Sequence, residues 1–388
     1  WKKYIPDGTK DILFDECENK VKLINKLREI YHQSGFQEII SPTLEFYDVF
    51  SGENSIIAQE KIYKLFDREG RILVLRPDIT TPILRIASTK LKNIPHPLRL
   101  SYSLNVFRIN DNYNGKLSEF TQSGIEIIGS NNLKVDVEVV VTAIKALKAA
   151  GLNNFKIELG QAEFIKTVLK NTGLNQDENE EIRLYIENKN FNALKEYLNI
   201  KKDRVNQETL SILNELPKLF GDIDVIDRAS KLVSSEIARQ ALRSLKKVYR
   251  AVCTLGYEKY ICIDLGMVQH LNYYTGIIFR GYAEGVGTSV LSGGRYDGLS
   301  KYFGDEQPSI GFALDVDSII SALKVTFQEK LKIEGLLIYF EEENMKKAYE
   351  KAEELRNEGK IVELSLNSSY VEAAAFAKEK NMEIIDIG

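Results

Sequence analysis

Two strands of a predicted hairpin decide the fold: Val106-Phe107-Arg108-Ile109-Asn110 and Glu119-Phe120-Thr121-Gln122-Ser123-Gly124-Ile125-Glu126. Side chains along a strand alternate between the two faces of a sheet, so Gln122, Gly124 and Glu126 share one face. The glycine leaves space above the sheet in which a small ligand could lie. Arg108 would place a positive charge at one end of that ligand. The pattern suits a zwitterionic amino acid, although a plain cross-strand ion pair is the alternative interpretation.

The bulk composition is that of a globular protein. The 388 residues are 44% hydrophobic and 28% charged, which allows two or three domains with a real core. The net charge of −4 and the pI near 5.8 give no sign of a basic face for nucleic acid. No apolar run reaches the length of a membrane span, and no signal peptide is visible.

The three cysteines, Cys17, Cys253 and Cys262, lack the spacing of metal ligands. Cys262 lies in an apolar strand pattern, which is typical of a small core residue. An odd number of cysteines without a short secreted framework indicates a reducing compartment. We therefore expect a cytoplasmic protein without a metal site.

Hydrophobic periodicity divides the chain into parts. Residues 1–325 carry mixed strand and helix patterns, interrupted at about 161–250 by a purely helical period that indicates an insertion. Residues 331–388 alternate strand and helix, which predicts a small α/β domain with a parallel three-stranded sheet. The elements expected in the first domain outside the insertion are helices at 16–34, 81–91, 134–150 and 315–323, and strands at 36–40, 62–66, 72–75, 98–109, 118–128, 259–265, 273–282 and 288–291.

Five further motifs accompany the hairpin. They are Gly35-Phe36-Gln37-Glu38-Ile39-Ile40-Ser41-Pro42-Thr43-Leu44-Glu45, Leu75-Arg76-Pro77-Asp78-Ile79-Thr80, Leu271-Asn272-Tyr273-Tyr274-Thr275-Gly276, Ser292-Gly293-Gly294-Arg295-Tyr296-Asp297-Gly298-Leu299 and Ile310-Gly311-Phe312-Ala313-Leu314. In this order they resemble the catalytic domain of histidyl-tRNA synthetase over about residues 4–325. The resemblance implies an α+β fold of the class II aminoacyl-tRNA synthetase type, with an antiparallel sheet flanked by helices. It also implies a homodimer through Gly35–Glu45, and residues 331–388 resemble a shortened anticodon-binding domain.

The same resemblance implies a histidine-binding site. Its residues would be Asp78, Thr80, Arg108, Gln122, Glu126, Tyr273 and Tyr274. Asp78 and Thr80 match the family's residues for the ammonium group, and Arg108 matches the arginine that serves the carboxylate. Glu126 and Tyr274 match the pair that reads the imidazole, with a carboxylate at one ring nitrogen and a phenol at the other. The alternative for the two tyrosines is strand core with one ring exposed.

Residues that would handle ATP are largely missing. The family's catalytic arginine corresponds to Gln269, and the arginine of its third signature motif corresponds to Ser318. Lys116 stands where another arginine is usual, and Asp317 would repel phosphate. Arg295 is retained, but one arginine cannot supply the positive charge that three arginines would place around ATP. His270 has no catalytic partner, and we expect no catalytic residue and no cofactor.

A chain that keeps the histidine positions and loses the ATP positions resembles the regulatory subunit of ATP phosphoribosyltransferase, a synthetase paralogue. That family works with a short catalytic chain in the first step of histidine biosynthesis, so histidine would act as a feedback effector. The resemblance implies a hetero-oligomer around a homodimer core, with no nucleic-acid or membrane partner. An active histidyl-tRNA synthetase and another ATP-dependent amino-acid-activating enzyme remain the alternatives, and both would need the missing residues.

Overall fold

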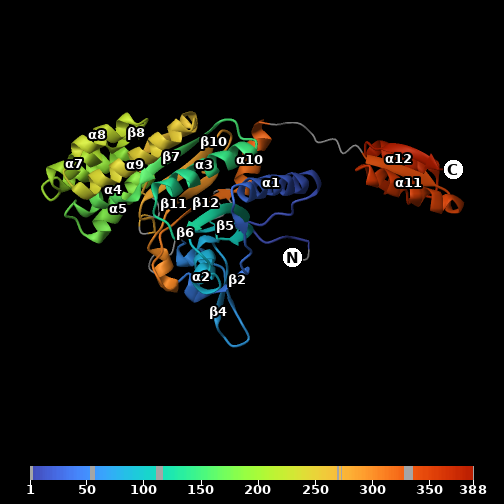
Figure 1. The fold of residues 1–388 in the computed structure, drawn as a ribbon, viewed down its shortest axis with the longest axis horizontal. Helices are drawn as coiled ribbons and strands as arrows, with labels where there is room; N and C mark the ends of the chain where they lie inside the picture. Colours follow the sequence, from blue (N-terminus) through green and yellow to red (C-terminus); the bar gives the residue numbers. More distant parts are fainter. Residues whose placement is uncertain are drawn as a thin grey trace. The chain divides into compact units, whose positions relative to one another are not determined.

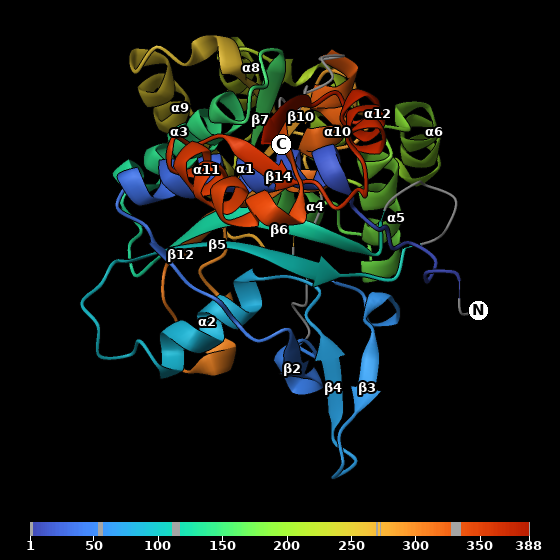
Figure 2. The same cartoon turned by 90° about the vertical axis from the view of Figure 1, so that its right-hand side faces the viewer.

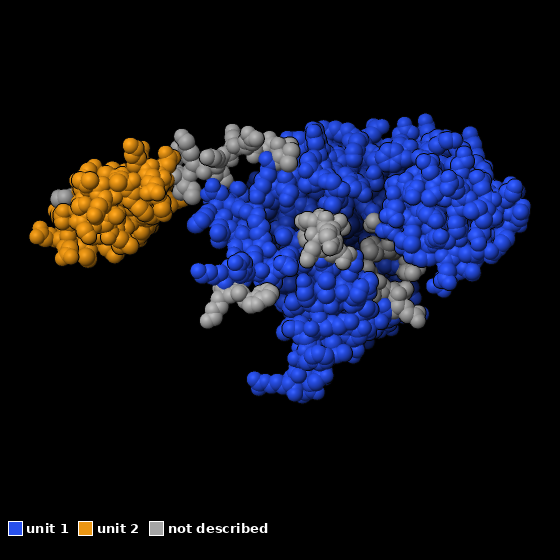
Figure 3. Space-filling view, turned by 180° about the vertical axis from the view of Figure 1, so that it is seen from behind, with its two compact units in different colours: residues 1–326 blue, residues 327–388 orange. Residues whose placement is uncertain are grey.

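The computed structural model describes residues 3–52, 57–110, 117–268, 271, 273–326 and 335–387. The chain divides into two compact units, residues 1–326 and residues 327–388, which are coloured separately in Figure 3. Each unit has its own sheet and its own buried core.

A nine-stranded sheet forms the centre of the first unit (Figure 1). In spatial order its strands are β1 (Gln37–Glu38), β5 (Leu98–Phe107), β6 (Glu119–Ile128), β12 (Ser309–Asp315), β11 (Leu291–Arg295), β10 (Ile277–Ala283), β7 (Phe155–Gln161), β9 (Ile261–Asp264) and β8 (Phe220–Gly221). The predicted hairpin is confirmed, because β5 and β6 pair antiparallel over their whole length. The sheet is mixed rather than purely antiparallel, since β1 pairs with β5 and β7 pairs with β9 in parallel.

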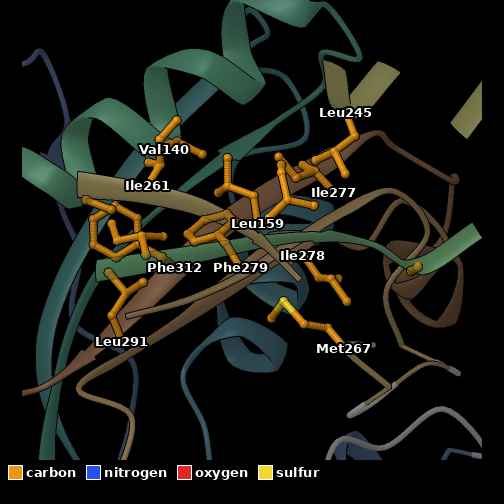
Figure 4. Close-up of a cluster of buried hydrophobic side chains, with 14 of the residues drawn as sticks. Val140, Leu159, Leu245, Ile261, Met267, Ile277, Ile278, Phe279, Leu291 and Phe312 are labelled. Atoms are coloured by element: carbon orange, nitrogen blue, oxygen red, sulfur yellow. The ribbon is translucent and has the colours of Figure 1, made fainter. Parts of the chain in front are cut away.

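Helices cover both faces of this sheet (Figure 2). On one face lie α1 (Phe14–Gln33), α3 (Leu133–Ala149) and α10 (Val316–Thr326), and on the other lies α2 (Thr80–Thr89). The main core lies under α1 and α3, where buried side chains from the sheet, such as Phe279 and Phe312, lie beneath Val140 of α3 (Figure 4). The sequence favours this arrangement because the sheet strands place an apolar side chain at every second position.

Helix α1 shows how local sequence sets an element. Leu23, Leu27 and Tyr31 recur at helical spacing and are its buried residues. Gly35 follows with a φ of +79° and donates its N–H to the carbonyl of His32 at 2.9 Å. Glycine adopts this left-handed conformation without steric cost, so Gly35 ends the helix at its C-terminus, close to the predicted boundary at residue 34.

The predicted helical stretch lies between β7 and β9. Its helices are α4 (Ala162–Lys170), α5 (Gln176–Glu187), α6 (Phe191–Lys201), α7 (Gln207–Glu215), α8 (Asp224–Leu232) and α9 (Glu236–Thr254). Their apolar faces join the main core, with Leu242 and Leu245 of α9 fully buried. The short strand β8 was not expected, and its pairing with β9 returns the insertion to the main sheet.

A second, three-stranded sheet lies in the same unit on the side of α2 (Figure 2). Its order is β2 (Leu44–Phe46), β4 (Ile72–Leu75) and β3 (Lys64–Phe66), all antiparallel. Several large apolar side chains in and beside it are exposed, among them Ile40, Phe46 and Phe66.

The second unit is a small parallel sheet of the order β14 (Ile361–Leu364), β13 (Gly335–Phe340) and β15 (Glu383–Ile387). Helix α11 (Met345–Asn357) packs on the face that carries Ile338, and α12 (Tyr370–Glu379) packs on the face that carries Leu337. This is the predicted strand–helix alternation. None of the helices in the described part of the chain has both the length and the apolar composition of a membrane span.

Candidate amino-acid site

The floor of the candidate site is a row of small residues on the sheet face that carries α2. Register places Gly311 of β12 opposite Glu126, Ala313 opposite Gly124, and Asp315 opposite Gln122. A Cβ atom at Gly311 would overlap the Glu126 carboxylate, so glycine is required for the carboxylate to lie across β12. Because Gly311 and Ala313 are small, larger side chains from neighbouring strands can lie across this face of the sheet.

The predicted open space over Gly124 does not exist in this structure. Tyr102, the cross-strand partner of Gly124, places its hydroxyl 2.8 Å from where a Cβ atom of Gly124 would lie. The hydroxyl donates to the carbonyl of Phe312 at 3.4 Å. The expectation of a ligand directly over Gly124 is therefore wrong. The hairpin register alone pairs Tyr102 with Gly124, and that signal was available from the sequence.

Glu126 is the buried polar centre of the site, with 1% of its surface exposed. Thr80 donates its hydroxyl to Oε1 of Glu126 at 2.7 Å, and Tyr296 donates its hydroxyl to Oε2. Burial raises the pKa of Glu126 to about 8, against the lowering effect of these hydrogen bonds, and the negative charge of Asp78 adds to the rise. Tyr296 belongs to the motif at residues 292–299 but was not among the predicted site residues.

Three tyrosine rings stand beside Glu126. Tyr273 stacks on Tyr296 with ring centroids 5.2 Å apart, and it meets Tyr274 edge-on at 4.8 Å. Tyr273 is buried in the core cluster that also contains Tyr102, whereas Tyr274 is half-buried and lies against Gly294. Burial raises the pKa of all three phenols, which keeps them protonated and able to donate hydrogen bonds at neutral pH.

Arg108 and Gln122 line a neighbouring pocket of about 480 Å³. Its other walls include the loop at 285–290 and the residues Asp315, Asp317 and Ser318. The Nε of Arg108 donates to the carbonyl of Pro77 at 2.7 Å, and its guanidinium lies 5.3 Å from the ring centre of Phe120. The remaining guanidinium N–H groups can donate to a carboxylate in the pocket.

Asp78 has a structural task in addition to any binding role. Its Oδ1 accepts the backbone N–H of Thr81 at 2.9 Å, and its Oδ2 accepts the Thr81 hydroxyl at 3.1 Å. A carboxylate at this place caps the first turn of α2. Burial raises the pKa of Asp78, and the nearby Arg108 opposes that rise.

The predicted ATP-side residues are engaged in the fold. Asp317 accepts the backbone N–H of Thr121 at 2.8 Å and the Nζ of Lys20 at 2.7 Å, so its charge is compensated rather than free to repel phosphate. Arg295 is buried and pairs with Asp136 at 2.5 Å and Asp297 at 3.0 Å. Treating Arg295 as a retained ATP-facing arginine was therefore wrong. Three positions considered above lie outside the described residues: Lys116, Gln269 and His270.

The structure thus arranges the predicted residues in two adjoining groups. Thr80, Glu126, Tyr273 and Tyr274 form a polar cluster in which Glu126 and Tyr273 are buried and the other two half-buried, with Asp78 close enough to affect the Glu126 charge. The other two residues, Arg108 and Gln122, face the pocket. The arrangement can hold a small molecule with a ring-borne N–H at one end and an anionic group at the other.

Comparisons with known proteins place this chain in a family. The family model described as histidyl-tRNA synthetase matches residues 8–319. The chain is 51% identical over 389 residues to the ATP phosphoribosyltransferase regulatory subunit of Clostridium kluyveri, covering 100% of this chain and 99% of that protein.

Solved structures agree in fold. A crystal structure of an ATP phosphoribosyltransferase regulatory subunit/histidyl-tRNA synthetase from Bacillus halodurans superposes with a TM-score of 0.89 at 31% identity, covering 100% of this chain and 98% of that one. Histidyl-tRNA synthetase from Nostoc superposes with a TM-score of 0.83 at 23% identity over 99% and 91% of the two chains, which shows the fold alone. The predicted class II synthetase-like fold is confirmed, and this chain belongs to the family of ATP phosphoribosyltransferase regulatory subunits.

Proposed function

We propose that this chain binds histidine in the candidate site and, through it, regulates an ATP phosphoribosyltransferase catalytic subunit in histidine biosynthesis. The observation that carries the proposal is the buried carboxyl group of Glu126, close enough to Tyr274 to raise the pKa of its phenol, next to a pocket lined by Arg108. A carboxylate and a phenol at one end and a guanidinium at the other match the two ends of histidine.

In this arrangement the imidazole of histidine lies against Glu126 and Tyr274. A carboxylate has about four lone-pair positions, so Glu126 can accept an imidazole N–H while it still accepts the hydroxyls of Thr80 and Tyr296. The α-carboxylate of histidine points toward Arg108. Its ammonium group lies on the side of Asp78, whose negative charge favours a cation even while its oxygens cap α2.

Histidine acts on a complex in this proposal, and not on an isolated chain. The relatives' name implies a catalytic ATP phosphoribosyltransferase subunit as the partner. A ligand shifts the equilibrium between two quaternary states only when it binds them with different affinity. In this proposal the geometry of the pocket differs between the active and the inhibited complex, and histidine therefore binds the two with different affinity.

We also propose that two copies of the synthetase-like unit form a homodimer within this complex. Ile40, Phe46 and Phe66 leave an exposed apolar surface on and beside the three-stranded sheet, with 75%, 46% and 74% of their surfaces exposed. Exposed apolar side chains in and beside one small sheet favour association with another surface. This surface adjoins the Gly35–Glu45 segment that resembles the family's dimer motif.

Calorimetric titration tests the binding step. The purified chain should bind histidine and should not bind histidinol with equal affinity, because histidinol lacks the carboxylate that Arg108 would receive. A chain that releases no heat with histidine and shows no shift in melting temperature at millimolar histidine would contradict the proposal. Histidine-dependent pyrophosphate exchange by the chain would instead support an active amino-acid-activating enzyme.

A further inference from the structure

The helical insertion holds the tyrosine segment of the candidate site. Lys166 of α4 donates from its Nζ to the backbone carbonyl of Tyr274 at 2.6 Å. Two residues on, the carbonyl of Gly276 accepts the backbone N–H of Ala162, the first residue of the same helix, at 2.9 Å. Both contacts join residues more than 100 positions apart in the chain, so they tie two separate parts of the fold together.

Of these two contacts, the hydrogen bond from Lys166 is the one made to Tyr274 itself. Among the hydrogen bonds of the described residues, the carbonyl of Tyr274 is held by Lys166, whereas Thr275 is held separately through its N–H to the carbonyl of Arg295 at 2.7 Å. The ring of Tyr274 is half-buried and packs against Gly294 and the edge of Tyr273, and no hydrogen bond of its hydroxyl is found among the described residues. The backbone of Tyr274, held by Lys166, therefore helps to set where the hydroxyl lies.

Burying part of a charged lysine side chain costs free energy, and the hydrogen bond to the Tyr274 carbonyl offsets that cost. The side chain is half-buried, and burial lowers its pKa, with Glu163 one turn earlier opposing the effect. A charged donor on a carbonyl gives a stronger bond than a neutral donor. Lys170, one turn further along α4, is exposed and makes no hydrogen bond or ion pair among the described residues, so it offers a matched control.

We propose that Lys166 is a positioning residue for histidine recognition: it acts through the Tyr274 carbonyl and thereby makes the helical insertion part of the histidine site. The proposal rests on the proposed function, because it concerns the same site. It assigns no contact between Lys166 and histidine. It predicts that the effect of losing Lys166 depends on the Tyr274 hydroxyl.

A double-mutant cycle tests this dependence by calorimetric titration with histidine on the full chain. Lys166→Met should weaken histidine binding by up to about tenfold, the contribution of one hydrogen bond from the Tyr274 hydroxyl to histidine. In a Tyr274→Phe background the same change should have less than a twofold effect, because the hydroxyl that Lys166 positions is already absent. Lys166→Arg should restore most of the affinity, and Lys170→Met should leave it unchanged.

The outcomes separate this inference from the proposed function. If the unaltered chain does not bind histidine, the proposed function fails. If the unaltered chain and Lys170→Met bind histidine but Lys166→Met binds equally well, the positioning role is wrong while the site stands. A tenfold loss that persists in the Tyr274→Phe background would assign Lys166 to general stability and overturn the proposal. Should Lys166→Met not fold, as judged by circular dichroism, Lys166→Gln replaces it with the same expected results.

Discussion

Replacing Glu126 with alanine should weaken histidine binding more than any other single change in the site. The carboxyl group is buried, and it is the acceptor nearest the place proposed for the imidazole. Its raised pKa keeps it largely protonated at pH 7 before histidine binds, and a bound cationic imidazole would favour its ionised form. Alanine leaves the imidazole N–H without an acceptor in a region from which water is largely excluded. A hydrogen bond to a charged group contributes about 1.5–3 kcal/mol, which corresponds to a loss of roughly ten- to a hundredfold in affinity.

The matched control is Glu119→Ala, at the other end of the same strand. Glu119 accepts the side-chain N–H of exposed Asn105 at 2.9 Å and does not line the candidate pocket. Calorimetric titration of both variants at pH 7 gives the comparison, with circular dichroism to confirm that each is folded. Equal histidine affinity in Glu126→Ala and in the unaltered chain would refute the assignment of Glu126 to the imidazole.

Three further predictions concern the pH dependence of stability, the proposed homodimer and the absence of amino-acid activation. Because the folded-state pKa of Glu126, about 8, lies above its unfolded value of 4.5, its contribution to stability is present below pH 4.5 and is lost as pH rises toward 8. Between pH 6 and 9, chemical denaturation should therefore show Glu126→Gln gaining about 2–3 kcal/mol relative to the unaltered chain, and a constant difference would contradict this. Phe66→Lys should shift the homodimer toward monomer in light scattering at micromolar concentration, whereas Lys64→Ala should not. The isolated chain should show no histidine-dependent pyrophosphate exchange, since Ser318 supplies no charge to ATP and losing one such contact commonly costs ~10²–10³ in rate.

Local patterns in the sequence predicted most helices and several strands of this fold, but not β2, β7 and β12, and β11 begins where the predicted strand at 288–291 ends. The β5–β6 hairpin, the end of α1 at Gly35 and the small parallel sheet of the second unit all follow from side-chain periodicity and turn residues. These features depend on neighbours a few residues apart. The strand β8 was missed because two residues carry no period, and its pairing with β9 is decided by the packing of the whole insertion.

The site was harder to predict because its contacts join distant segments. The motifs single out the residue types, but Asp136, the partner of Arg295, lies 159 positions away and could not be inferred from the turn that contains the arginine. Likewise, the compensation of Asp317 by Lys20 joins the two ends of the first unit. Whether a charged side chain contacts a ligand or pairs with another residue depends on its burial and on partners from distant segments. The linear sequence does not show either of these.

The most direct test of the proposed regulation measures phosphoribosyl transfer in the assembled complex. The rate is recorded for a short ATP phosphoribosyltransferase catalytic chain alone, with this subunit, and with this subunit plus histidine at increasing concentration. The same series is run with Glu126→Ala and with Glu119→Ala as its control. We predict that histidine inhibits the complex with the unaltered subunit and with Glu119→Ala, and that Glu126→Ala requires roughly ten- to a hundredfold more histidine for the same inhibition. Unchanged inhibition in the Glu126→Ala complex would place the sensing site elsewhere and contradict the proposed mechanism.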